Sequence, residues 1–325
     1  MTTEPLWNDI VKFGQKTLLD TELFTVSWIL GRFCNYNCSY CWPYARTDKP
    51  DYQDMMSYIL TMDSIKSQAR DNGFNDFHFS FSGGEPTAFK GFTELLEHYV
   101  NDSKPEYQSI HMTTNLSPGS KWWAKWLTVT DSLSRRSITA SFHAEHANEQ
   151  EFGDKCLQLI NNGVLLTINQ VMVPDHFDEY LERSQRFIDR GINVTLKPQS
   201  NTTATSIVEY TEDQLKILKE QFVLQNNNTK VAQIQLEDSK GNLYEVDQAE
   251  RLNAFGFNQF KGWNCNAGFQ GVVIRENEVK RSYSCHEEPL GTMTDGFKLF
   301  KEPKKCVTET CISSADSKLP KSRHV

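Results

Sequence analysis

Three cysteines fall within eight residues of the segment RFCNYNCSYCW, at Cys34, Cys38 and Cys41. Three thiolates are one ligand short of the closed tetrahedral site that holds a structural zinc ion. Thiols this close along the chain are also poorly placed to form disulfides with one another. The spacing therefore predicts a metal centre that the chain leaves open for a further ligand.

A second group of four cysteines lies near the C-terminus, and only Cys156 stands apart from both groups. Its place in a helical pattern, Phe152, Cys156, Ile160, indicates a packed apolar side chain. In a reducing compartment, metal binding or catalysis explains eight cysteines better than a disulfide framework does. Four thiolates suit a structural zinc ion or an iron-sulfur cluster equally well, so their number leaves both open. The group consists of Cys265, Cys285, Cys306 and Cys311.

An alternation of short β-rich runs and longer helical patterns must position these cysteines, and it begins at residue 23. The strand candidates are LFTVSWIL (23–30), FHFSFS (77–82), SIHMTTN (109–115), ITASFHA (138–144), LLTINQVMV (165–173) and NVTLKPQ (193–199). Two of the helical patterns between them end in the Gly expected just past a helix C-terminus. Repeated strand, helix, strand units form right-handed parallel crossovers, with functional loops at the strand C-terminal ends. Six units predict an α/β fold, a partial (β/α)6 TIM-like barrel with a lateral mouth.

Four segments follow from these patterns. They are an N-terminal extension over 1–22, the partial barrel over 23–200, a linker helix and hairpin over 201–260, and a small cysteine-bearing α+β extension over 261–325. NTTATS reads as a linker, and two hairpins are expected, one around Ser239 to Gly241 and one near Glu276 and Asn277. No separate leader-binding domain is evident before the first strand, which favours a small substrate or a short peptide.

Net charge and hydropathy limit the classes of partner that the protein can bind. Lys and Arg number 34 against 42 Asp and Glu, and the net charge of −8 argues against nucleic acid as the main partner. A basic stretch near the C-terminus leaves a local phosphate contact open. No segment approaches the roughly 18 apolar residues that span a membrane, and no signal peptide is evident. We therefore expect a cytoplasmic protein without membrane contact.

The cysteine loop resembles that of the radical S-adenosylmethionine (SAM) enzymes. Cys34, Cys38, Tyr40 and Cys41 meet their CxxxCxφC signature, in which φ is aromatic. The segment FSGGEP, after the second strand, is similar to the GGEP motif of the same family. The resemblance covers roughly residues 23–200. It implies that three thiolates hold a [4Fe-4S] cluster whose fourth iron is open to SAM, which would explain the incomplete site.

The resemblance also implies a set of SAM contacts. Glycines of the GGEP motif allow close backbone approach, and its carboxylate edge can bind the SAM ammonium group. By position, Asn115 resembles a ribose contact and Ser141 resembles the polar residue at the end of the fourth strand. The expected cofactor-binding residues are Tyr40, Gly83, Gly84, Glu85, Pro86, Asn115 and Ser141.

The C-terminal cysteines resemble a twitch-type extension, the shorter relative of the SPASM domain, in which four cysteines bind one auxiliary [4Fe-4S] cluster. A small loop-rich segment buries too little surface to be stable by itself, so a metal centre that links its cysteines would stabilise the fold. The chain departs from the family at Lys280, where Gly is usual. If all four thiolates bind the cluster, none of its irons is open to a substrate. The resemblance therefore implies that this cluster transfers electrons and does not bind the substrate directly.

The leading expectation is an enzyme that cleaves SAM to a 5′-deoxyadenosyl radical, abstracts hydrogen from a C–H bond of a small molecule or peptide, and completes an oxidation or rearrangement. A reducing partner such as flavodoxin or ferredoxin would supply the electron. Lys197 and Gln199 at the sixth strand, and His143 with His146 after the fourth, are the catalytic candidates. The alternatives are modification of a nucleotide or nucleic-acid base, and a non-enzymatic zinc-binding module.

Overall fold

The computed structural model describes most of the chain. The described residues are 7–19, 21–41, 46–102, 107–201, 206–220, 223–224, 234–246, 258–285, 288–311 and 313–323. Four of the six residues of the expected linker NTTATS lie outside them. Within the described residues, no helix is long and apolar enough to cross a membrane.

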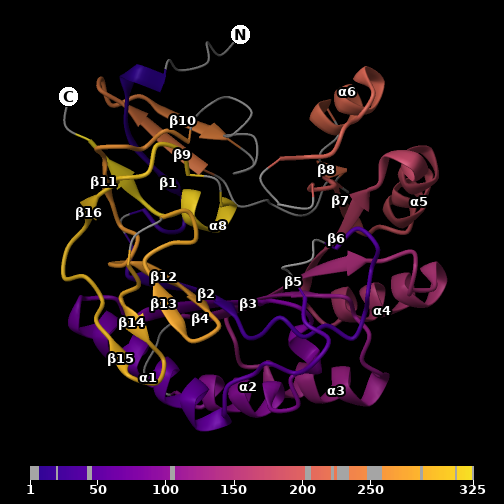
Figure 1. The fold of residues 1–325 in the computed structure, drawn as a ribbon, viewed down its shortest axis with the longest axis horizontal. Coiled ribbons are helices and arrows are strands. Elements are labelled where there is room, and N and C mark those ends of the chain that lie inside the picture. The colour runs from indigo at the N-terminus through magenta and orange to yellow at the C-terminus, as the bar shows by residue number, and fades with distance from the viewer. Residues whose placement is uncertain are drawn as a thin grey trace.

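Six adjacent parallel strands form the centre of the molecule, in chain order, and confirm the expected α/β partial barrel (Figure 1). The sheet is open, because its two outermost strands are not paired with each other. The six strands are β2 (Leu23–Ile29), β3 (Asp76–Ser82), β4 (Gln108–Thr114), β5 (Arg135–Phe142), β6 (Leu165–Met172) and β7 (Asn193–Pro198).

Helices line the convex side of this curved sheet (Figure 1). They are α1 (Met55–Asp71), α2 (Phe92–Val100), α3 (Ser120–Val129), α4 (Glu149–Asn161) and α5 (Phe177–Asp189). The side chains of Asp54 and Asn148 cap α1 and α4 by accepting backbone N–H bonds. Gly163 and Gly191 follow the ends of α4 and α5 with φ of 79° and 84°, as expected from the sequence.

The two faces of the sheet differ sharply in polarity. On β3, Phe77, Phe79 and Phe81 belong to the core under the helices, and the same alternation holds on β4 and β5. Because successive side chains point to opposite faces, the intervening residues lie on the concave face. Most of them are polar. They are Thr25, Ser27, His78, Ser80, Ser82, Ser109, His111, Thr113, Arg135, Ser137, Thr139, Ser141, Thr167, Asn169, Thr195 and Lys197.

The C-terminal part extends this sheet. Strand β12 (Gly271–Arg275) pairs parallel with β2, and β13 (Glu278–Lys280), β14 (Gly291–Thr292) and β15 (Gly296–Phe297) follow as antiparallel strands. At the other end, β8 (Val223–Leu224) pairs with β7. The hairpin expected near Glu276 is confirmed by the pairing of β12 with β13.

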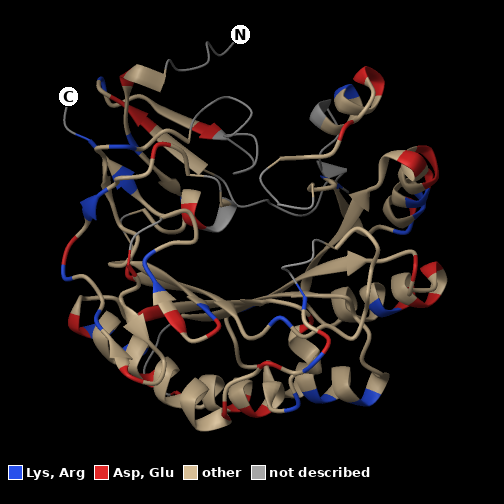
Figure 2. Ribbon diagram, in the orientation of Figure 1, with Lys and Arg blue, Asp and Glu red and all other residues tan. Residues whose placement is uncertain are grey.

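A second sheet joins the two ends of the chain, in the order β10, β9, β1, β17, β11, β16. Its strands are β1 (Ile10–Gln15), β9 (Ile234–Asp238), β10 (Leu243–Val246), β11 (Asn264–Cys265), β16 (Lys304–Lys305) and β17 (Lys321–Ser322). The expected hairpin around Ser239 is confirmed by the pairing of β9 with β10. Basic residues lie on β16 and β17 of this sheet (Figure 2).

The remaining elements are short. They are α6 (Glu212–Glu220), α8 (Ser314–Ser317) and the 3-10 helices η1 (Trp7–Asp9), η2 (Pro86–Ala88) and η3 (Pro174–His176). Because β1 pairs with β17 and β9, residues of the N-terminal extension share a core with the C-terminal cysteines.

Candidate functional site

The three-cysteine loop follows β2 and is joined by backbone hydrogen bonds to the loop after β3. The Gly84 N–H donates to the Gly31 carbonyl at 2.9 Å, and the Glu85 N–H donates to the Phe33 carbonyl at 2.9 Å. A Cβ at Gly84 would lie 2.2 Å from the Phe33 oxygen, and one at Gly83, where φ is 138°, would lie 2.2 Å from the Gly31 oxygen. Glycine is therefore required at both positions for the two loop backbones to approach each other, independently of any contact with a ligand.

The three thiols lie within electrostatic range of one another. Burial raises the pKa of Cys38 to about 12, with further increases from the charges of Glu145, Cys34 and Cys41. Burial also raises the pKa values of Cys34 and Cys41. Such thiols gain most from a cationic metal centre, because it stabilises the thiolate form that burial disfavours.

The segment after β5 holds this loop from the other side. His143 Nδ1 lies 2.8 Å from the Tyr40 hydroxyl and 3.3 Å from the Cys38 sulfur, and its ring stacks on Tyr40 with centroids 5.9 Å apart. The carboxylate of Glu145 accepts hydrogen bonds from the Ser39 N–H and hydroxyl. His143, proposed from the sequence as catalytic, thus lies beside the cysteine loop. Burial lowers its pKa to about 4.

The buried Glu85 carboxylate links the GGEP loop after β3 to the end of β4 by hydrogen bonds. Its side chain is 2% exposed. It accepts hydrogen bonds from the Thr87 N–H and hydroxyl at 3.0 and 2.6 Å, the Thr114 hydroxyl at 2.7 Å and the Asn115 N–H at 2.7 Å. Burial raises the pKa of the carboxyl, against the lowering effect of these donors. The structure gives this carboxylate partners within the chain, so a direct bond to the SAM ammonium group stays a prediction.

The Glu85→Gln variant tests this set of hydrogen bonds. An amide cannot accept from all four donors, and its own N–H₂ would face the Asn115 N–H. An unsatisfied buried donor costs about 1–3 kcal/mol, so we expect that loss in the free energy of unfolding, measured by urea denaturation. Glu94→Gln, an exposed change on α2, should cost less than about 0.5 kcal/mol. Equal losses in the two variants would contradict the role of Glu85.

Asn115 and Ser141 lie at neighbouring strand ends, as the sequence predicts. The side chain of Asn115 donates to Asn35 Oδ1 at 2.9 Å and accepts from the Ser117 N–H at 2.9 Å, so it ties β4 to the cysteine loop. Ser141 pairs in register with Asn169, and alternation puts it on the concave face. Pro86 begins η2 and is buried. Their roles toward a cofactor stay predictions.

Lys197 lies near the end of β7, and Gln199 directly follows the strand. Lys197 lies on the concave side and is exposed, as its alternation with Leu196 requires. The Gln199 N–H donates to the Tyr210 hydroxyl at 2.7 Å, and its Oε1 is buried without a hydrogen-bond partner. Strand β6 lies between β7 and β5, the strand that precedes His143.

Sequence reasoning missed the polar concave face. The signal was available in FHFSFS, SIHMTTN and ITASFHA, where Ser, Thr or His stands at every second position. Parallel strands are usually apolar on both faces, so this alternation marks a face that is not packed against a helix. The cysteine loop lies at the strand ends that border this polar concave face.

The four C-terminal cysteines come together around the second sheet. Cys265, Cys306 and Cys311 belong to one buried cluster with Phe13, Phe260 and Trp263. The Cys306 N–H donates to the Trp263 carbonyl, and the Cys311 N–H donates to the Asn258 carbonyl, both at 2.8 Å. These bonds fix the backbone from which the thiols project.

Electrostatics link the same four thiols. Burial raises the pKa values of Cys285 and Cys306, and that of Cys311 to about 12, and the charge of Cys265 raises each of them further. Lys321 acts in the opposite direction on Cys306 and Cys311. The donor set thus fits a thiolate-ligated metal group. In the part of the chain that the structure describes, no three Cys, His, Asp or Glu side chains are arranged to hold a single metal ion.

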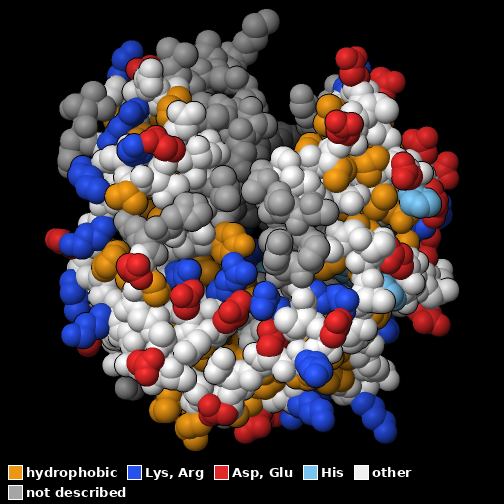
Figure 3. Space-filling view, viewed as in Figure 1, with side chains coloured by type: hydrophobic (Ala, Val, Ile, Leu, Met, Phe, Trp, Pro, Cys, Tyr) orange, Lys and Arg blue, Asp and Glu red, His pale blue; other side chains and the backbone are white. Residues whose placement is uncertain are grey.

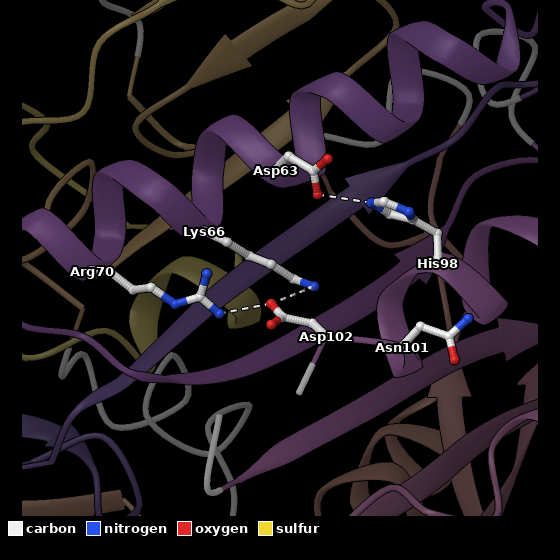
Figure 4. Close-up of a pocket in the computed structure, with 6 residues that line it drawn as sticks. All are labelled: Asp63, Lys66, Arg70, His98, Asn101 and Asp102. Atoms are coloured by element: carbon white, nitrogen blue, oxygen red, sulfur yellow. Dashed lines mark hydrogen bonds and ion pairs between the residues drawn. The ribbon is translucent and has the colours of Figure 1, made fainter. Parts of the chain in front are cut away.

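A cavity lies on the convex side, between α1 and α2 (Figure 4). Asp102 forms ion pairs there with Lys66 at 3.3 Å and Arg70 at 2.6 Å, and Asp63 lies 2.7 Å from His98. Its charged groups are therefore largely satisfied by one another.

Comparison with known proteins identifies relatives of this arrangement. A family model described as the radical SAM superfamily matches residues 28–221, more than half of the chain. The solved structure of native anSMEcpe with bound AdoMet has a TM-score of 0.51 and 14% identity over 85% of this chain and 79% of that one. Its complex with AdoMet and Kp18Cys peptide gives the same values. BtrN in complex with AdoMet and 2-DOIA has a TM-score of 0.42 and 13% identity, covering 85% and 80%. No curated protein matches the sequence.

Proposed function

Because the chain belongs to the radical SAM superfamily, whose members are enzymes that bind SAM and a [4Fe-4S] cluster, we propose that it abstracts hydrogen from a C–H bond of a small molecule or peptide. An oxidation or rearrangement then completes the reaction. The observation that carries this proposal is the three-thiol loop after β2, hydrogen-bonded to the GGEP loop after β3 at the border of the polar concave face.

Each group of residues has a distinct task. Cys34, Cys38 and Cys41 would hold three irons and leave the fourth for SAM, and a reduced cluster would supply the electron that cleaves SAM to methionine and a 5′-deoxyadenosyl radical. The backbone of Gly83 and Gly84 would lie along the cofactor. Tyr40, Pro86, Asn115 and Ser141 would shape its site, with Glu85 holding the strand ends in place.

The polar concave face would receive the substrate. Hydroxyl, imidazole and amide side chains on the concave face can hydrogen-bond a polar molecule and fix which C–H bond faces the cysteine loop. A substrate bound against this face would displace bulk water and so protect a reactive intermediate from quenching. We propose that Lys197 and Gln199, at the end of β7 near the open edge of the sheet, contact the substrate.

We further propose that Cys265, Cys285, Cys306 and Cys311 bind an auxiliary [4Fe-4S] cluster that accepts an electron. A zinc ion draws four sulfurs to within about 2.3 Å of one point, whereas a four-iron cluster takes one thiolate on each iron. The four thiols interact electrostatically, which fits either group, and the radical SAM context favours the cluster. A flavodoxin or ferredoxin would serve as the reducing partner.

Anaerobic reconstitution tests the proposal. We expect a brown protein with about eight irons per chain, in two four-iron clusters. With dithionite as reductant and SAM added, it should form 5′-deoxyadenosine, and the formation should increase with the true substrate. Colourless protein that binds zinc would instead support the binding-module alternative. Brown protein that never forms 5′-deoxyadenosine would contradict the proposed enzyme.

A further inference from the structure

The segment that follows β5 contacts three consecutive residues of the cysteine loop. His143 Nδ1 lies 3.3 Å from the Cys38 sulfur and 2.8 Å from the Tyr40 hydroxyl. Between these two residues, the Ser39 N–H donates to the Glu145 carboxylate at 2.9 Å, and the Ser39 hydroxyl donates to the same group. One short segment therefore fixes both the backbone and the side chains around a single thiol.

The segment is itself held by hydrogen bonds. It folds into a tight turn, in which the N–H groups of His146 and Ala147 both donate to the His143 carbonyl at 2.9 Å. The turn leads directly to Asn148, whose side chain caps α4. The His143 ring stacks on Tyr40, with centroids 5.9 Å apart and ring planes inclined by 18°. Because the imidazole is held from its backbone and from one ring face, its Nδ1 atom has little freedom to turn away from the thiol.

Metal binding decides the direction of the hydrogen bond between His143 and Cys38. A thiol can donate to a ring nitrogen or accept from it, but a metal-bound thiolate has no proton and can only accept. With the ring proton on Nε2, two lone pairs would face each other across 3.3 Å. With the proton on Nδ1, the N–H faces the sulfur and the Tyr40 oxygen, both of which can accept. Occupation of the site by a metal group therefore selects the Nδ1–H tautomer.

The surroundings make this donor important to the sulfur. The Ser39 N–H, which follows Cys38 in the chain, is already engaged by Glu145. Cys38 is 9% exposed, and only part of the His143 surface is accessible. Little histidine surface is visible on the face drawn in Figure 3, where Lys, Arg, Asp and Glu side chains predominate. A hydrogen bond that is shielded from water is electrostatically stronger than an exposed one.

We propose that His143 is a positioning residue for the cluster, whose Nδ1–H donates to the Cys38 thiolate and raises the reduction potential of the cluster. The inference rests on the proposed function, in which Cys38 holds one iron. Hydrogen bonds to the sulfurs are among the factors that set the potential of an iron-sulfur cluster. A donor stabilises the additional negative charge of the one-electron-reduced form. The electron comes from the external reductant, and no bond forms or breaks. This role differs from the catalytic role expected from the sequence.

Redox titration of the reconstituted full chain, followed by electron paramagnetic resonance, tests the hydrogen bond. The barrel cluster is identified as the signal that changes when SAM is added. His143→Phe keeps an aromatic ring beside Tyr40 but removes the donor. We expect its equilibrium constant for reduction to fall about tenfold, which is a potential about 59 mV more negative. His143→Asn carries an amide N–H₂ near the position of Nδ1 and should stay closer to the wild-type potential.

Glu145→Gln is the matched control from the same segment. It keeps an oxygen that can accept from the Ser39 N–H and removes a negative charge beside the loop, so the potential should not fall. An equal fall in Glu145→Gln would show that any disturbance of the segment lowers the potential, and it would overturn the proposal. An unchanged potential in His143→Phe would do so too, as would a shift in His143→Asn as large as that in His143→Phe.

A second measurement, on wild-type protein, decides the outcome if His143→Phe does not hold a cluster. In protein that contains histidine labelled with ¹⁵N in the ring, pulsed electron paramagnetic resonance of the reduced barrel cluster should detect a weakly coupled ring nitrogen. Absence of this coupling would overturn the proposal by itself. Neither readout depends on turnover. A hydrogen-bonded cluster that never cleaves SAM would leave this inference standing and remove the proposed function, whereas SAM cleavage with an unchanged potential in His143→Phe would do the opposite.

Discussion

The Cys38→Ala variant is expected to lose 5′-deoxyadenosine formation by more than about 100-fold, because it removes a cluster ligand, and even outer-shell changes at metal sites cost 10–100-fold. Cys38 is 9% exposed and lies at the centre of the loop, in electrostatic contact with Cys34 and Cys41. Iron content should fall from about eight to about four atoms per chain. Both quantities are measured on anaerobically reconstituted protein with dithionite and SAM.

Cys156→Ala is the matched control for Cys38→Ala. Cys156 is fully buried on α4 within the main core, and burial raises its thiol pKa, as expected of a packed apolar residue. Its replacement should cost about 1 kcal/mol of stability and leave iron content and SAM cleavage unchanged. A Cys38→Ala protein that still forms 5′-deoxyadenosine at the wild-type rate would show that this loop is not the cluster site.

The Cys311→Ala variant should uncouple SAM cleavage from completed turnover. The thiol is 6% exposed and packs in the cluster that also contains Cys265 and Cys306. Its loss should remove the auxiliary cluster, again leaving about four irons per chain, while the barrel cluster remains. We expect 5′-deoxyadenosine to form and oxidised product to fall at least about 10-fold, since the electron would lack its acceptor.

Two measurements separate this result from simple unfolding. The absorbance of the remaining cluster and the far-ultraviolet circular dichroism should persist in Cys311→Ala, and Cys306→Ala should give the same pattern. Full product formation by either variant would remove the auxiliary cluster from the mechanism. A zinc ion in place of the four auxiliary irons in wild-type protein would do the same.

Much of the fold could be predicted because its signals are local. Six strands and their intervening helices follow from runs of a few residues and from the glycines that end α4 and α5. The two C-terminal hairpins follow from turn residues in the same way. The parallel pairing of β12 with β2 and the joining of β1 to β17 could not be predicted, because these partners are far apart in sequence and no local pattern encodes their register.

The amino-acid sequence alone determined the chemistry that is available: three thiols with an open-site spacing, a glycine-rich motif after the next strand, and four more thiols near the C-terminus. These follow from residue type and spacing, which folding does not change. Only the tertiary structure decided that Glu85 is held by the chain's own donors and that His143 lies beside Cys38. Such facts depend on which face each strand turns inward and on contacts between distant segments, and both are settled only when the core packs.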